Sequence, residues 1–142
     1  MIGPAGQRAY DLLSVDPGVE YFAWARWQDS TLVEAGLDRD NRYLTNRFPD
    51  TTTVVVELTQ TRTGDRKKQK QIDGLIRAAG EIAGQFPNRV YGLQTLPKKI
   101  FQDRAWDALR PEEREVLEKF KKKDLYHILD AVGYGMKYLR RI

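Results

Sequence analysis

The sequence of 142 residues contains no cysteine, which excludes disulfide bonds, thiolate catalysis and any metal site with a cysteine ligand. It has no apolar run long enough to cross a bilayer, and its beginning lacks the apolar core of a signal peptide. No internal repeat or linker-like stretch rich in proline, glycine and serine interrupts it. We therefore expect one domain over residues 1–142, in the cytoplasm and without a membrane partner.

Charged residues make up 31% of the chain, and the formal net charge is +4. A mildly basic balance suits a polyanionic partner, although many basic proteins bind no nucleic acid. The basic residues gather in three clusters: Arg62, Arg66, Lys67, Lys68 and Lys70; Lys98 and Lys99; and Lys119, Lys121, Lys122 and Lys123. Taken alone, each cluster is better explained by a solvated surface or a helix end.

Five segments rich in β-branched or aromatic residues predict strands, at residues 11–16, 20–28, 31–37, 51–58 and 89–94. The second and third flank Asp29-Ser30, which predicts a hairpin with a tight polar turn. In the fourth, Val55 and Glu57 are expected to share one face, because alternate side chains of a strand point the same way.

Helical spacing of apolar residues and proline punctuation predict helices at residues 67–85, 97–109, 111–120 and 124–140. A hairpin group followed by a strand, a helix, a strand and further helices predicts an α/β protein. Its mixed five-stranded sheet would carry helices on both faces. Among such architectures, the ribonuclease-H-like fold has this order of elements.

Two acidic residues stand at unusual positions in the predicted strands. Asp16 ends the first strand, where turn chemistry alone would explain it, since Asp before Pro-Gly often starts a turn. Glu57 lies in a β-branched run, where a charge is costly unless it is exposed or paired. An outward-facing strand residue and a functional residue explain Glu57 about equally well.

The last predicted helix carries His127, the only histidine of the chain, and Asp130 one turn later. A helical wheel places His127, Asp130 and Tyr134 opposite an apolar stripe made of Leu125, Leu129, Val132, Met136 and Leu139. We expect the stripe to be buried and the polar side to face away from the core. An ordinary amphipathic helix would show the same pattern, but this polar side is poor in Lys and Glu.

Asp16, Glu57 and Asp130 supply three carboxylates from distant segments, and Mg²⁺ prefers carboxylate oxygens as protein ligands. Two Mg²⁺ ions about 3.5–4 Å apart can activate water and stabilise the leaving oxygen in phosphodiester hydrolysis. If the first and fourth strands are neighbours, Asp16 and Glu57 lie close together, and a cation would relieve their repulsion. His127 could be a ligand, a proton shuttle or a phosphate contact.

Three motifs resemble those of RuvC-type Holliday junction resolvases, the crossover junction endodeoxyribonucleases of the ribonuclease-H-like superfamily. Val15-Asp16-Pro17-Gly18, followed by Ala23-Trp24-Ala25 and Glu34-Ala35-Gly36-Leu37, is similar to the family's opening hairpin. Val54-Val55-Val56-Glu57 resembles the fourth strand, and residues 124–133 resemble the last helix. The compact length and residues 97–113 look most like phage-encoded members.

The resemblance implies that Asp16, Glu57, His127 and Asp130 form the catalytic metal site, with two Mg²⁺ ions that Mn²⁺ could replace. It implies a homodimer, joined near residues 69–85, that cuts four-way DNA junctions by symmetric paired nicks in a bacterial or phage-infected cell. The residues expected to contact DNA phosphates are Arg62, Arg66, Lys67, Lys68, Lys98 and Lys99.

The chain departs from the family in one respect. Cellular members carry an aromatic residue shortly after the Glu, for contact with bases at the junction, whereas residues 58–70 contain none. This puts base stacking and a cutting-sequence preference in doubt. Two alternatives therefore stay open: a broader nuclease for flaps and forks, and a basic DNA-binding module without catalysis.

Overall fold

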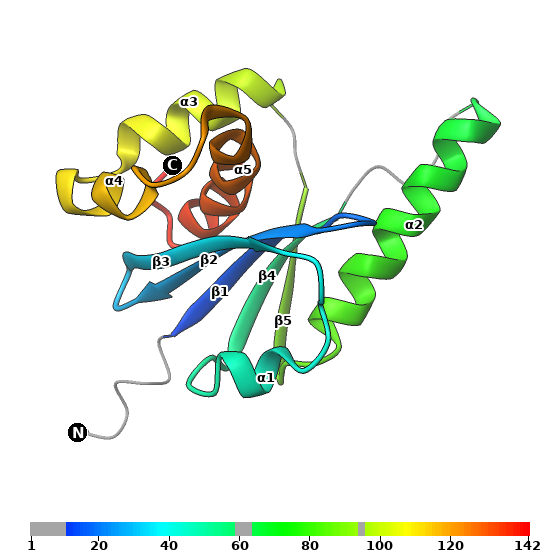
Figure 1. Ribbon diagram of the computed structural model, residues 1–142, viewed down its shortest axis with the longest axis horizontal. Coiled ribbons are helices and arrows are strands. Elements are labelled where there is room, and N and C mark those ends of the chain that lie inside the picture. The colour runs from blue at the N-terminus through cyan, green and yellow to red at the C-terminus, as the bar shows by residue number, and fades with distance from the viewer. Residues whose placement is uncertain (1–10, 59–63, 94–95) are drawn as a thin grey trace.

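A computed structural model describes residues 11–58, 64–93 and 96–142. Its strands are β1 (Leu12–Asp16), β2 (Phe22–Gln28), β3 (Thr31–Asp38), β4 (Thr53–Leu58) and β5 (Asn88–Leu93). They form one sheet in the order β3-β2-β1-β4-β5 (Figure 1). The first three strands pair antiparallel, and β1, β4 and β5 run parallel, so the predicted mixed sheet is confirmed.

The turn between β2 and β3 is the predicted two-residue hairpin connection. Asp29 and Ser30 have φ values of 50° and 67°, so both central residues adopt the left-handed region. Two consecutive positive φ values give the type of turn whose twist matches that of the flanking strands.

The helices are α1 (Leu44–Arg47), α2 (Arg66–Ala83), α3 (Lys98–Ala108), α4 (Pro111–Leu117) and α5 (Lys122–Tyr138). Helix α2 covers one face of the sheet, and α3, α4 and α5 lie on the other, as Figure 1 shows. The sequence predicted all of these except α1, whose four residues are too short to show helical spacing. None of the helices in the described ranges is long and apolar enough to span a membrane.

Two cores lie on the two sides of the sheet because neighbouring residues of a strand point to opposite faces. Val15 and Val56 pack with Ile82 of α2, whereas Leu12 and Val55 belong to the cluster that contains the middle of α5. The predicted division of β4 between its two faces is therefore correct.

Helix α5 differs from the amphipathic helix that the sequence predicted. Every residue from Ile128 to Met136 is buried, so the expectation that one side faces away from the core was wrong. Asp130 and Tyr134 are only 2% and 1% exposed. The physical reason is that α5 packs against both the sheet and α3. A Cβ atom at Gly135 would lie 2.3 Å from Trp27 Nε1, so only glycine allows this close approach to the sheet.

Candidate metal centre

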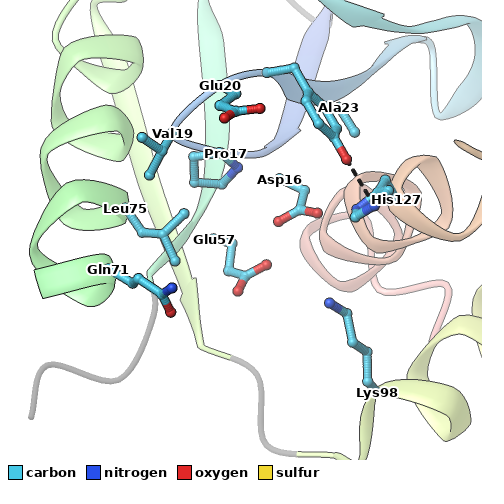
Figure 2. A pocket seen from close by; sticks show the side chains of 12 residues that line it. Asp16, Pro17, Val19, Glu20, Ala23, Glu57, Gln71, Leu75, Lys98 and His127 are labelled. Atoms are coloured by element: carbon cyan, nitrogen blue, oxygen red, sulfur yellow. Dashed lines mark hydrogen bonds between the residues drawn. The ribbon is translucent and has the colours of Figure 1, made fainter. Parts of the chain in front are cut away.

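The carboxyl ends of β1 and β4 place Asp16 and Glu57 side by side. The two strands are parallel, and their register pairs Val15 with Val56, so each carboxylate follows directly after this pair. Both side chains point toward the α5 side of the sheet, as Leu12 and Val55 do. They line a cleft of about 560 Å³ whose other walls include α2, Lys98 and His127. Figure 2 shows Asp16, Glu57 and Lys98 converging on this space.

Helix α5 brings His127 and Asp130 to the same place. One potential ligand atom from each of Asp16, His127 and Asp130 lies within 4.8 Å of the other two. Glu57 lies outside this group of three, but it is the neighbouring charge that acts most strongly on Asp16. The structure therefore brings together all four residues that the sequence singled out for a metal site, from β1, β4 and α5.

The acidic residues of this cluster destabilise one another's charge. Burial, followed by the charge of Glu57, raises the pKa of Asp16 well above its ordinary value. Burial also raises the pKa of Asp130, although Lys98 and Gln102 oppose that effect. A bound cation would offset this repulsion and the cost of burial, because it favours the ionised form of every carboxylate that it contacts.

Asp130 has a different partner on each of its two oxygens. The side-chain amide of Gln102 donates a hydrogen bond of 3.0 Å to Oδ1. Oδ2 forms an ion pair with the ammonium of Lys98 at 3.5 Å and accepts no well-formed hydrogen bond from the described residues. Sequence analysis assigned no role to Gln102, although its spacing of four from Lys98 on a helix places the two on one side.

Two tyrosines complete the surroundings of the cluster. Tyr21, on the wall of the cleft, forms a hydrogen bond of 3.2 Å with Nε2 of His127, and their rings meet edge to face. Tyr134 is buried, and burial followed by the charge of Glu57 raises the pKa of its hydroxyl. The first contact fixes the orientation of the His127 ring, and sequence analysis missed it because 106 positions separate the two residues.

The residues of the cleft fit a hard divalent cation. The donors are carboxylate oxygens and one imidazole, a set that suits Mg²⁺ or Mn²⁺. The buried Oδ2 of Asp130 lacks a hydrogen bond within the described part of the chain, which leaves a lone pair directed at the cluster. The candidate metal group therefore consists of Asp16, His127 and Asp130, with Glu57 adjoining it.

Five of the six predicted DNA-binding residues lie in the first turns of α2 and α3. Helices α2 and α3 follow the parallel strands β4 and β5 in the chain, and Figure 1 shows the first turns of α2 extending beyond the sheet. Arg66, Lys67 and Lys68 are exposed in the first turn of α2, and Lys99 is exposed in the first turn of α3. Lys98 lines the cleft itself. Arg62 lies outside the described residues.

Comparisons with known proteins agree with this geometry at the level of the fold. No protein-family model and no curated protein matches the sequence. The structure is similar to Thermus thermophilus RuvC solved in complex with a Holliday junction substrate, with a TM-score of 0.57 at 13% identity. That match covers 92% of this chain and 95% of the other. The fold is ribonuclease-H-like.

A second solved structure has the same fold. The yeast mitochondrial Holliday junction resolvase Ydc2 matches with a TM-score of 0.54 at 12% identity, over 92% of this chain and 80% of that one. At such low identity the likeness concerns the arrangement of strands and helices. The activity has to be inferred from the site.

Asp16→Asn is expected to stabilise the metal-free protein at neutral pH. The pKa of Asp16 is raised in the folded state, so the folded protein loses stability as pH rises from the unfolded-state value of 3.8 through this raised pKa. Asparagine removes that loss, and in EDTA at pH 7.5 we expect the Tm to rise by about 3 °C or more. Added Mg²⁺ should raise the Tm of the wild type and leave the variant almost unchanged. A variant that melts below the wild type in EDTA would contradict the proposed repulsion.

Proposed function

We propose that this protein is a metal-dependent endonuclease that resolves four-way DNA junctions by paired phosphodiester hydrolysis. The observation that carries the proposal is the meeting of Asp16, His127 and Asp130 at one edge of a ribonuclease-H-like sheet, with Glu57 beside them. The motifs that contain these residues resemble those of RuvC-type resolvases, phage-encoded members included, and this supports the proposed activity. It also points to the cytoplasm of a bacterial or phage-infected cell.

Asp16, Glu57 and Asp130 would hold two Mg²⁺ ions, or Mn²⁺ in their place. When bound, these ions supply a water of lowered pKa and neutralise the charge that develops on the phosphate. His127 stands where it can add a ligand or move a proton at its ring nitrogen, and Tyr21 holds its ring in place. Gln102 fixes the orientation of Asp130 by its hydrogen bond to Oδ1.

We assign the phosphate contacts to Arg62, Arg66, Lys67, Lys68, Lys98 and Lys99, of which Lys98 lines the cleft. Each neutralised phosphate releases condensed counterions, so binding is expected to weaken steeply with salt. An acidic cleft with Lys98 in its wall, and with exposed basic residues in the first turns of α2 and α3, suits a polyanion whose scissile phosphate would reach the metal while its flanking phosphates contact Lys and Arg.

We propose that the protein is a homodimer whose interface lies on the exposed half of α2. In the second half of this helix, Ala79 and Ile82 are buried on the sheet, but in the first half Ile72, Leu75 and Ile76 are only partly buried. Figure 1 shows this half of α2 extending beyond the sheet. A second copy of the chain would cover the apolar stripe there, and two subunits would place two sites on the two strands to be cut.

Ile76→Glu is therefore expected to convert the dimer to a monomer, because it places a charge in the proposed apolar interface. Sedimentation velocity at micromolar concentration measures the change. Arg77→Glu, at the next and exposed position, is the matched control and should sediment as the wild type does. If the wild type is itself a monomer without DNA, or if Ile76→Glu remains a folded dimer, this interface is wrong.

The experiment that tests the substrate is a comparison of four labelled DNAs of matched sequence: a four-way junction, a fork, a flap and a plain duplex. Selective nicking of the junction in Mg²⁺ is expected. Equal cutting of all branched forms would favour the broader branch nuclease, which the lack of an aromatic residue in 58–70 also suits. Tight binding with no cutting in Mg²⁺ or Mn²⁺ would favour a binding module.

A further inference from the structure

The two oxygens of Asp130 are not equivalent, and the difference concerns Lys98. Oδ1 is occupied by the hydrogen bond from Gln102, at 3.0 Å. Oδ2 is buried, accepts no well-formed hydrogen bond in the described ranges, and forms an ion pair with Nζ of Lys98 at 3.5 Å. A cation that binds Asp130 through Oδ2 would therefore meet the ammonium of the lysine at the same oxygen.

The side chain of Lys98 can reach this oxygen and can also move away from it. Its side chain is 67% exposed, while that of Asp130 is 2% exposed, so only the ammonium end enters the acidic cluster. It stands at the first residue of α3, where its stem is not enclosed by a core. Figure 2 shows the ammonium directed from α3 toward Asp16 and Glu57. Such a long, flexible cation can exchange one partner for another.

We infer that the ammonium of Lys98 takes the place of a metal ion in the metal-free protein. It neutralises Asp130 there and competes with the divalent cation for Oδ2. The inference rests on the proposed metal site. Metal binding displaces the ammonium, which then stays in the cleft, where it can contact a phosphate of the bound DNA. The phosphate contact predicted from the sequence and the observed ion pair are then two positions of one side chain.

This role predicts that loss of the Lys98 ammonium strengthens metal binding in the absence of DNA. A lysine that only held phosphates would not affect metal binding in the absence of DNA. A competing lysine makes metal binding weaker than the carboxylates alone would allow, because an ammonium and a divalent cation that share one carboxylate repel each other. Removing the ammonium while keeping the length of the side chain should therefore improve metal affinity.

The test is calorimetric titration of the full chain with Mn²⁺ and with Mg²⁺, without DNA, for the wild type and Lys98→Met. We expect the variant to bind metal more tightly by about fivefold or more, the lower end of ordinary coupling between two sites. Lys123→Met removes the same charge from an exposed lysine outside the cleft and should change the affinity less than twofold, about the size of a screened surface effect. Thermal unfolding in EDTA gives a second measurement, in which Lys98→Met should melt below the wild type and recover when metal is added.

The outcomes separate this inference from the function on which it rests. If the wild type binds metal and Lys98→Met binds it with equal or lower affinity, the competition is refuted and the metal site stands. If neither protein binds metal, the proposed site and the competition fail together. Equal gains in Lys98→Met and Lys123→Met would reduce the effect to net charge, and this too would refute a specific role for Oδ2.

Discussion

Glu57→Gln is expected to abolish nicking of a four-way junction in Mg²⁺ while leaving the affinity for the junction intact. Glutamine keeps the size of the side chain but removes a negative charge next to Asp16, at the carboxyl end of β4. Because metal ions contribute several kcal/mol of transition-state stabilisation, we expect the rate to fall on the order of 10³-fold. Single-turnover cleavage with excess protein measures the rate, and fluorescence anisotropy at the same salt concentration measures the binding.

The matched control is Glu20→Gln. Glu20 is an exposed carboxylate on the wall of the same cleft, so the same chemical change there tests whether any loss of acidity at the cleft slows the reaction. Its rate is expected to stay within about threefold of the wild type, since a screened surface charge contributes little. A Glu57→Gln variant that cuts as well as Glu20→Gln would exclude a metal-binding role for Glu57.

Glu113→Gln is expected to destabilise the fold by about 3 kcal/mol, which is the second large effect. The carboxylate is fully buried and accepts hydrogen bonds from the guanidinium of Arg141 at 2.7 and 2.8 Å. It also accepts from the backbone amides of Leu32 and Arg110, so one side chain joins β3, α4 and the end of the chain. Removing one partner of a buried ion pair commonly costs about 3–5 kcal/mol.

The pH dependence of stability checks the same residue. These contacts lower the pKa of Glu113 from 4.5 to about 2, a difference that corresponds to about 3 kcal/mol. Because the folded-state value is depressed, the stabilisation is complete above pH 4.5 and is lost as pH falls toward 2. Urea unfolding of the wild type should show this loss, and Glu113→Gln should show a flatter profile. Identical profiles would mean that the ion pair contributes nothing.

The local parts of the fold were predictable from the sequence. Every strand begins within two residues of its predicted start, because β-branched runs and the Asp29-Ser30 turn are local signals. The division of β4 between its two faces also follows from alternation alone. The burial of α5 on all sides did not follow, since it depends on α3 lying over the helix and on glycines that fit Trp27 and Phe101.

The candidate site was predictable as a set of residues and not as a set of contacts. Four residues stand out because each places an ionisable group next to predicted core positions, where packing alone does not explain it. They are Asp16, Glu57, His127 and Asp130. The contact of Lys98 with Asp130 joins positions far apart in the chain, and so does that of Glu113 with Arg141. No local sequence pattern predicts either contact. Sequence analysis therefore predicted only a phosphate contact for Lys98.

The most direct test of the function is the nicking of one four-way junction, labelled in turn on each strand, by the wild-type protein with Mg²⁺ and then with EDTA. We expect paired nicks at symmetry-related positions of two opposing strands in Mg²⁺, and no nicks in EDTA. A junction that stays intact in both Mg²⁺ and Mn²⁺, although the protein is bound to it, would contradict a metal-dependent resolvase.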